Sequence, residues 1–406
     1  MRDNDRVSNL EPLVLRGRVV TPERVVADGA VVVEGERLAW VGAADEVPRR
    51  WSRAVRATGP SPDTLLPGLV DLHNHGGGGV SFPEAGDVEA VRTAVREHLA
   101  HGTTRLVASL VTAPAPVLLE RVRTLAAVVA TGEVAGIHLE GPFLSALRCG
   151  AQDPRAMVPG DVGLVHEVAL AADGAFATMT YAPEVAGSHD VVRALAQGGA
   201  VPSIGHTDAS AEQTRASIEL ALEVLAADGT RSRRPTATHL FNAMRPLHHR
   251  EPGPAGECLA AAARGELVVE LVADGVHLAD ATTRMVFDLV GPDNIALVTD
   301  AMAATGMPDG DYVLGGLDVT VSDGVARLAE GGAIAGGTAH LLDVVRRTVG
   351  LGVPLEDAVR AASLVPAGVL GRDDVGALLE GRLADVVVAD DELAVRAVYR
   401  AGERVA

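Results

Sequence analysis

The sequence contains no lysine, so all 35 of its formally cationic side chains are arginine. This absence excludes every mechanism that needs a lysine side chain. Aromatic residues make up only 2% of the chain, although 48% of it is hydrophobic. A core of this composition must be built from valine, leucine, isoleucine and alanine.

Cysteine is also scarce, because the chain holds only Cys149 and Cys258. Neither belongs to a C-x-x-C pair, and two cysteines cannot build the disulfide framework of a small secreted protein. We therefore expect two reduced thiols, as is usual in cytosolic proteins.

Excess positive charge and long apolar runs are lacking as well. The formal net charge of -19 argues against nucleic-acid and anionic-membrane partners, because both require a basic face. No stretch approaches 18 uninterrupted apolar residues, and the amino-terminal segment MRDNDRVSNLEPLV lacks the apolar centre of a targeting signal. These features predict a cytoplasmic protein with no nucleic-acid partner and no membrane partner.

Both ends of the chain show the pattern of short strands and turns. Valine-rich segments broken by glycine, proline and charged residues occupy residues 13–22, 29–42 and 385–405. We interpret residues 1–66 and 372–406 as one small β-sandwich domain formed from both termini, with a larger domain inserted between them.

The inserted domain, residues 67–371, alternates buried strands with amphipathic helices. Apolar residues recur at three- and four-residue spacing over residues 87–100, which predicts a helix. Eight segments have the pattern of buried strands: 65–73, 104–112, 134–141, 176–183, 201–206, 236–242, 267–275 and 294–302. Repeated β-α units imply parallel pairing, and eight of them favour a closed (β/α)8 TIM barrel over an open sheet. Residues 311–327 have the pattern of a hairpin inserted after the eighth strand.

The stretch PGLVDLHNHGGGG, residues 67–79, ends the first barrel strand with two histidines one residue apart. Residues i and i+2 of a strand face the same side, so His73 and His75 can bind one cation while Asn74 points away. Imidazole and carboxylate ligands suit zinc or iron(II), and water bound to such an ion can ionise at about pH 7. The four glycines that follow either let the backbone approach the site closely or form a plain flexible loop.

Further ionisable side chains end the other barrel strands, where the loops of a TIM barrel surround the active site. A single histidine there is more often structural than a ligand, and a single aspartate can simply cap the next helix. The joint pattern instead predicts a site for one or two divalent metal ions, and its members are His73, His75, Glu140, His206, His239, His277 and Asp300. Asp300 is well placed to accept a proton from water and deliver it to a leaving group. We interpret the other histidines as structural: His98, His101, His138, His166, His189, His248, His249 and His340.

Longer motifs resemble the amidohydrolase superfamily and, within it, the N-acetylglucosamine-6-phosphate deacetylases. The resemblance covers nearly the whole chain, and the motifs follow the family order: PGLVDLHNHGGGG, HLEGPFL, IGHTDA, THLFNAMRPLHHREPG, LVADGVH, LVTDAM and AIAGG. H-x-H alone would identify only the superfamily, whereas HLEGPF together with THLFNAM and REPG is highly specific. The resemblance implies metal-dependent hydrolysis of the N-acetyl amide of N-acetylglucosamine-6-phosphate to glucosamine-6-phosphate and acetate, in amino-sugar catabolism or recycling.

The resemblance also implies a role for each matching position. Glu140, His206 and His239 would bind the principal metal. His73 and His75 would contribute to a second one, because the family includes one-metal and two-metal members. Asp300 would act as general base and acid. The phosphorylated sugar would be held by Asn242, the backbone of Ala243, Arg250, His277 and the backbone of Ile334, Ala335 and Gly336, with Arg250 reaching across the interface of a homodimer.

One position departs from the family pattern. After HLEGPFL the family usually has Gly-Ala-His or Gly-Thr-His, where this chain has Gly150, Ala151 and Gln152. The family histidine is associated with the substrate amide. Gln152 can donate a hydrogen bond but cannot become cationic, which leaves the stabilisation of the oxyanion and the preferred acyl sugar open. We include Ala151 and Gln152 among the candidate substrate-binding residues.

Other functions stay open at this point. A related N-acyl hexosamine, such as N-acetylgalactosamine-6-phosphate, is an alternative substrate. Cyclic-amide hydrolases of the hydantoinase or dihydroorotase type commonly bridge two metals with a carboxylated lysine, which Glu140 would have to replace here. A catalytically silent barrel that serves as a scaffold or sugar-phosphate sensor is disfavoured, because the metal-capable residues and Asp300 are all present.

Overall fold

The computed structural model describes residues 11–227 and 229–406. Residues 1–10 lie outside the described residues. They include the start of the predicted small domain and most of the amino-terminal segment in which we expect no targeting signal. Among the described helices, none combines the length and the apolar composition that crossing a membrane requires.

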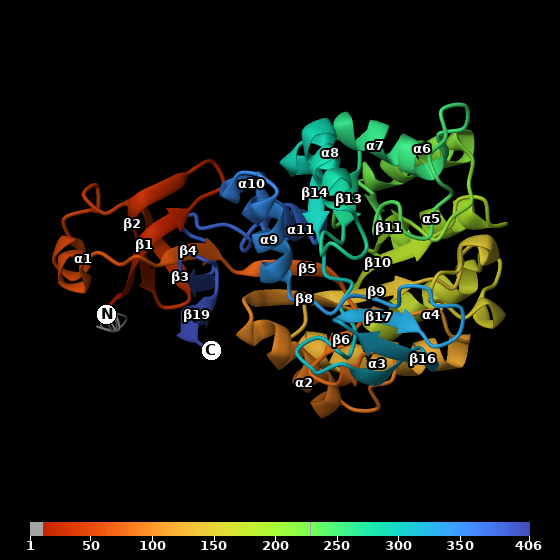
Figure 1. Cartoon of the computed structure of the whole chain (residues 1–406), viewed down its shortest axis with the longest axis horizontal. Helices are drawn as coiled ribbons and strands as arrows, with labels where there is room; N and C mark the ends of the chain where they lie inside the picture. The colour runs from red at the N-terminus through yellow and green to blue at the C-terminus, as the bar shows by residue number, and fades with distance from the viewer. Residues whose placement is uncertain (1–10, 228) are drawn as a thin grey trace, which may run out of the picture.

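A seven-stranded sheet joins the two ends of the chain, beside the barrel (Figure 1). The amino-terminal part supplies β1 (Leu13–Val20), β2 (Val25–Glu34), β3 (Arg37–Ala43) and β4 (Thr64–Pro67), and the carboxyl-terminal part supplies β18 (Val386–Ala389), β19 (Val395–Arg400) and β20 (Glu403–Arg404). The two parts meet where β18 pairs antiparallel with β4, in the order β20-β19-β18-β4-β1-β2-β3. Helix α1 (Ser52–Thr58) packs against β1. A separate sheet domain built from both termini is thus confirmed, whereas its bounds of 1–66 and 372–406 stay a prediction.

Eight parallel strands form the barrel, as predicted. They are β5 (Leu69–Asn74), β8 (Thr103–Leu110), β9 (Gly136–Glu140), β10 (Phe176–Tyr181), β11 (Val201–Ile204), β12 (Thr236–Ala237), β13 (Val268–Leu271) and β14 (Ile295–Leu297). Backbone hydrogen bonds bring the last strand against the first: the His75 N–H donates to Ala301 O over 2.7 Å, and the Asp300 N–H donates to His73 O over 3.0 Å. The TIM barrel is therefore confirmed, and its nearly closed ring brings Asp300 beside the two histidines of β5.

Helices surround the strands (Figure 1). They are α2 (Val88–Ala100), α3 (Ala115–Ala130), α4 (Val162–Ala172), α5 (Ser188–Gln197), α6 (Ala211–Leu225), α7 (Gly253–Ala263), α8 (Asp280–Val290), α9 (Leu341–Gly350), α10 (Leu355–Ala361) and α11 (Leu364–Val369). Short 3-10 turns occupy Ala146–Arg148, Pro154–Ala156 and Pro292–Asn294. The helix predicted over 87–100 is α2, which begins after Asp87 because that side chain accepts a hydrogen bond from the Ala90 N–H. Its buried face includes Val91 and Val95, which join the main core.

One part of the barrel interior is aliphatic, as the composition predicts. One buried cluster contains only valine, leucine and alanine, and it takes Val70 from β5, Val107 from β8 and Val201 from β11. Helix α11 contributes Val365 and Val369 to the same cluster, because it packs against β5 and β14. Small aliphatic side chains fill such an interior without leaving a pore.

The insertion after the eighth strand has three strands instead of the two that a hairpin predicts. They are β15 (Gly310–Leu314), β16 (Leu317–Ser322) and β17 (Val325–Leu328), paired in antiparallel order. The chain reverses a second time at Asp323 and Gly324, whose φ angles of 52° and 71° suit a two-residue hairpin turn. A further short pair, β6 (Gly76–Gly77) with β7 (Val80–Ser81), follows directly after His75.

Candidate metal centre

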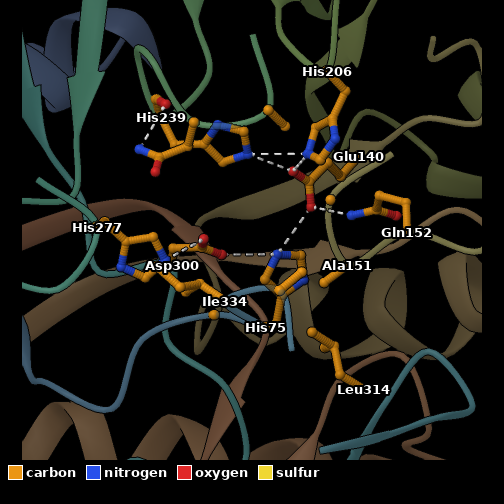
Figure 2. A pocket seen from close by; sticks show the side chains of 15 residues that line it. His75, Glu140, Ala151, Gln152, His206, His239, His277, Asp300, Leu314 and Ile334 are labelled. Carbon is orange, nitrogen blue, oxygen red and sulfur yellow. Dashed lines mark hydrogen bonds and ion pairs between the residues drawn. The ribbon is translucent and has the colours of Figure 1, made fainter. Parts of the chain in front are cut away.

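A cavity of about 240 Å³ opens among the residues that follow the barrel strands (Figure 2). Twelve of the residues selected from the sequence line it: His75, Glu140, Ala151, Gln152, His206, His239, Asn242, Ala243, His277, Asp300, Ile334 and Gly336. His73 is fully buried beside them, with its Nε2 2.9 Å from His75 Nε2. The structure thus brings together side chains from six barrel strands and the segments after them.

Glu140 lies at the centre of this group, at the end of β9. Its Oε1 lies 2.7 Å from His206 Nε2 and 2.8 Å from His239 Nε2. Its Oε2 faces the other pair, 3.2 Å from His75 Nε2 and 3.8 Å from His73 Nε2. Glu140 thus belongs to two groups of three residues, one with His206 and His239 and one with His73 and His75. Within each group the candidate ligand atoms lie within 4.8 Å of one another. Two imidazoles and a carboxylate are a common ligand set for divalent metals, so these residues fit such an ion, with Glu140 shared between two sets.

Three of these side chains follow their strands in an uncommon backbone conformation. His206, His239 and Asp300 have φ angles of 47°, 29° and 49°. A positive φ in a residue other than glycine costs roughly 1–3 kcal/mol, and such strain concentrates at functional sites. These three positions are two candidate metal ligands and the candidate proton carrier, and the cavity-lining Ala243 shares the conformation with a φ of 48°.

Hydrogen bonds from the opposite ring nitrogen hold the histidines in place. His75 Nδ1 donates to Ser109 O over 3.2 Å, and His206 Nδ1 donates to Arg148 O over 2.9 Å. His73 Nδ1 lies 3.3 Å from Glu270 Oε2. Such contacts fix the tautomer that leaves Nε2 free to bind a metal. His239 differs, because its buried Nδ1 has no hydrogen-bond partner within residues 11–227 and 229–406.

Glu270 was not selected from the sequence. Its side chain is buried on β13, within the otherwise apolar stretch LVVEL. An isolated carboxylate in a buried strand was the available signal, since such a group needs a partner.

The electrostatics of the cluster favour bound positive charge. Burial alone would lower the pKa of His73, but the carboxylates of Asp300, Glu140 and Glu270 outweigh burial and raise it well above its ordinary value. Burial would likewise raise the pKa of Asp300, yet the neighbouring imidazoles His73 and His75 lower it. Against the same burial, neighbouring imidazoles lower the pKa of Glu140 as well, so Glu140 and Asp300 are held ionised, and a divalent cation would supply positive charge to this cluster.

Asp300 connects the metal-ligand group to His277 and Asp274. Its Oδ1 lies 3.2 Å from His75 Nε2, and its Oδ2 lies 3.6 Å from His277 Nε2. His277 Nδ1 in turn donates to Asp274 Oδ2 over 2.8 Å. Burial lowers the pKa of His277, but Asp274 and Asp300 more than offset burial and raise it. Asp274 was missed in the sequence, although it stands three residues before His277 in the quoted motif LVADGVH.

The remaining candidates lie in three different settings. Gln152 donates from Nε2 to Glu140 Oε2 over 2.7 Å, which places it directly on the central carboxylate (Figure 2). Ala335 is fully buried and is absent from the cavity lining. Arg250 is exposed and also lies outside the lining of this cavity. Sequence reasoning missed three lining residues, Gly150, Leu314 and Ala333, which carry no distinctive chemistry.

His138 has a structural setting, as expected. It is buried, with Nδ1 2.9 Å from Ser109 Oγ and Nε2 2.8 Å from Thr180 Oγ1. Both ring nitrogens are therefore engaged away from Glu140. Burial, together with the neighbouring His73, lowers the pKa of His138 well below its ordinary value, so that it stays neutral.

Comparison with known proteins identifies relatives over almost the whole chain. The family model described as "Amidohydrolase family" matches residues 64–405. The N-acetylglucosamine-6-phosphate deacetylase of Homo sapiens is 36% identical over 363 residues, which cover 84% of this chain and 83% of that protein. The N-acetylgalactosamine-6-phosphate deacetylase of an Escherichia coli strain is 33% identical over 356 residues, covering 86% and 89% of the two chains.

A solved structure extends the comparison to the fold. It shows a variant of the N-acetyl-D-glucosamine-6-phosphate deacetylase from Mycobacterium smegmatis in complex with N-acetyl-D-glucosamine-6-phosphate. It superimposes with a TM-score of 0.87 at 42% sequence identity, covering 97% of this chain and 99% of that chain.

Proposed function

The chain belongs to the amidohydrolase family, and from this membership we propose that it hydrolyses the N-acetyl amide of N-acetylglucosamine-6-phosphate to glucosamine-6-phosphate and acetate. One observation carries the proposal: Asp300 lies 3.2 Å from His75, in the same cavity as the histidines around Glu140. A metal-ligand set and a carboxylate for proton transfer thus border one space.

The residues assigned to the metal are those with the closest donor atoms. Glu140, His206 and His239 form the principal set, while His73 and His75 form the second set with the other oxygen of Glu140. The donors suit zinc or iron(II). A divalent cation held by these residues would lower the pKa of water and polarise the amide carbonyl.

Asp300 performs the proton transfers in this proposal. Its depressed pKa keeps it ionised near neutral pH, so it can accept the proton of the attacking water. The protonated carboxyl group then delivers that proton to the departing amine. His277, 3.6 Å from Asp300 Oδ2, helps to hold the carboxylate at this position.

Recognition of the sugar phosphate is assigned to the rim of the cavity. Asn242, Ala243 and His277 line one part of it, and Ile334 and Gly336 line another. A Cβ atom at Gly336, whose φ is +83°, would lie 2.9 Å from Asp300 O, so only glycine allows this close approach.

In a homodimer, we assign Arg250 to the phosphate group of the substrate that is bound in the neighbouring subunit. Its exposure, away from the cavity of its own chain, supports a contact in trans. A guanidinium can hold a phosphate through two parallel hydrogen bonds, and the local charge matters more than the acidic total. The dimer and the cytoplasmic location stay predictions.

N-acetylgalactosamine-6-phosphate is the second candidate substrate. The Escherichia coli relative that bears this name is 33% identical to the chain, and Gln152 stands where the family usually has histidine. The two sugars differ only at the C4 hydroxyl group, so their relative kcat/KM tests recognition and leaves the chemistry unchanged.

A panel of amides tests the proposed function. Purified protein loaded with zinc or iron(II) is offered N-acetylglucosamine-6-phosphate, N-acetylgalactosamine-6-phosphate, unphosphorylated N-acetylglucosamine and dihydroorotate, and the hydrolysis products are measured. We expect the highest kcat/KM with N-acetylglucosamine-6-phosphate, loss of activity with a chelator and recovery with metal. Preference for dihydroorotate, or full activity in metal-free protein, would overturn the proposal.

A further inference from the structure

A second cluster with the same donor composition lies outside the cavity. Glu97 on α2, His101 directly after α2 and His340 directly before α9 each present a ligand atom, and these atoms lie within 4.8 Å of one another. The group contains two imidazoles and one carboxylate, as does the group of Glu140, His206 and His239. Each of its histidines, taken alone in the sequence, has the structural interpretation given above.

Two contacts converge on one carboxylate oxygen, while His101 Nδ1 also donates to the backbone O of Glu97 over 2.8 Å, a hydrogen bond that a bound ion has to replace. Glu97 Oε1 lies 2.9 Å from His340 Nε2 and 3.4 Å from His101 Nδ1. A tetrahedral zinc ion about 2.0 Å from each donor holds its donors roughly 3.3 Å apart, close to both separations. The rings of His101 and His340 stack with centroids 3.6 Å apart and planes inclined by 15°, which keeps their nitrogens on the same side of the cluster.

A carboxylate stands behind the more buried histidine. Asp343 Oδ2 lies 3.5 Å from His340 Nδ1 and accepts a hydrogen bond from the His340 N–H over 3.2 Å. Metal-binding histidines commonly face a carboxylate or carbonyl with the nitrogen that does not bind the metal. Asp343 also pairs with Arg346 over 2.7 Å, so its own charge is partly compensated.

The cluster is accessible from solvent, unlike the buried group around Glu140. The side chain of His101 is 44% exposed and that of His340 is 11% exposed. Both line a surface cavity of about 400 Å³, together with Asp343 and Arg346. An ion can therefore enter directly, and water can complete its coordination.

The position of the cluster gives such an ion a structural consequence. His98 follows Glu97 on α2, and its Nε2 donates to the backbone O of Gly76 over 2.9 Å. Gly76 is the residue directly after His75. A Cβ atom at Gly306 would overlap the carboxylate of Glu97, so the loop after the eighth strand also approaches the cluster closely. An ion here would tie α2 to α9 behind the segment that supports His75.

We propose that Glu97, His101 and His340 bind a divalent transition-metal ion of the zinc class at the surface, separate from the metal centre of the cavity, and thereby clasp α2 to α9. The proposal is independent of the deacetylase function. A cluster held only by hydrogen bonds and ring stacking is the competing explanation, and metal counting distinguishes the two.

The experiment uses protein in which two ligands of the principal metal set are removed, His206→Gln with His239→Gln, which lowers the zinc content of the cavity; the set of His73, His75 and Glu140 is kept in every version, so any zinc there is common to all of them. This protein is compared with versions that also carry His101→Gln with His340→Gln, or Glu97→Gln. A control carries His166→Gln with His189→Gln, which removes two exposed histidines on α4 and α5. Each protein is equilibrated with zinc, dialysed against metal-free buffer without chelator, and analysed for zinc per chain; circular dichroism confirms that each is folded.

We expect the two cluster variants to hold about one zinc ion fewer per chain than the parent and the control, on the ligand count of such a site. We also expect zinc to raise the Tm of the parent and the control more than that of the cluster variants, because each ion that binds only the folded state stabilises it. Glu97→Gln keeps the shape of the side chain, so its result stands if the double variant fails to fold. Equal zinc counts in parent and cluster variants, or equal zinc-dependent Tm shifts, would leave a hydrogen-bonded cluster only and overturn the proposal.

Discussion

The side-chain amide of Gln152 donates a hydrogen bond to Oε2 of Glu140 over 2.7 Å, while its oxygen accepts one from the Thr112 N–H, also over 2.7 Å. The backbone contact fixes which end of the amide faces Glu140. Gln152 therefore acts on the oxygen that faces His75, at a position where the family usually has histidine.

The first prediction concerns this contact. Gln152→Ala should lower kcat/KM for N-acetylglucosamine-6-phosphate about 10- to 100-fold, because a hydrogen bond to a charged group contributes about 1.5–3 kcal/mol. Gln152→Glu should lower it further, since a second carboxylate would face Glu140. Steady-state kinetics measure both, and a wild-type kcat/KM in Gln152→Ala would show that the contact is dispensable.

The second prediction concerns the two histidines at the end of β5. Replacing His73 and His75 with glutamine should reduce the metal content by about one ion per chain, since two of the three second-set donors are lost. Metal analysis of protein reconstituted with zinc measures the change. His138→Gln is the matched control, because His138 is buried beside His73 but binds Ser109 and Thr180. An unchanged metal content in the double variant would return His73 and His75 to a structural role.

The third prediction is that KM for the phosphorylated sugar changes with pH because His277 titrates. Burial lowers its pKa, but Asp274 and Asp300 raise it above the ordinary value of 6.5, so the cationic form persists to higher pH than in a free imidazole. As the pH rises through this pKa, the imidazole loses its charge, and KM for the phosphorylated sugar should rise. Asp274→Asn removes one raising carboxylate and should move this rise in KM to lower pH. Profiles of KM against pH that coincide in the two proteins would contradict the assignment.

The fourth prediction separates recognition of the phosphate from the chemistry. Arg250→Ala should mainly raise KM for N-acetylglucosamine-6-phosphate, provided that the contact is equal in ground and transition states. The unphosphorylated sugar should be hydrolysed as by the wild type. Arg264→Ala is the control, because Arg264 is exposed and pairs only with Glu266 in the described contacts. If Arg250→Ala discriminates between the two sugars as strongly as the wild type does, the phosphate contact is assigned to the wrong residue.

Strand and helix positions could be predicted because they depend on local periodicity. The predicted segment 236–242 contains β12, which has only two residues. Even so short a strand could be found, because its sequence and the motif that follows it are local signals. The second turn of the insertion, at Asp323 and Gly324, was not predicted, because the sequence around it is also compatible with the second strand of a single hairpin.

The site was predictable where a residue type repeats at strand ends, and not where the partner comes from elsewhere in the chain. Glu270 acts through its contact with His73, which only the closed barrel creates, whereas Asp274 contacts His277 within one loop, at a spacing of three residues that carries no distinctive pattern. His101 and His340 are far apart in sequence, and their stacking depends on how the end of α2 lies relative to the start of α9. The setting of Arg250 likewise depends on tertiary structure, which no local pattern encodes.

The most direct measurement compares kcat of the wild type and Asp300→Asn on N-acetylglucosamine-6-phosphate, with both proteins loaded with the same metal and their metal content verified. Asparagine is nearly isosteric with aspartate but cannot accept and return the proton. We expect the wild type to release acetate and glucosamine-6-phosphate in equal amounts, and Asp300→Asn to lower kcat by a factor on the order of 10² to 10⁴ while the sugar phosphate still binds. No acetate release by the metal-loaded wild type, or a wild-type kcat in Asp300→Asn, would contradict this expectation.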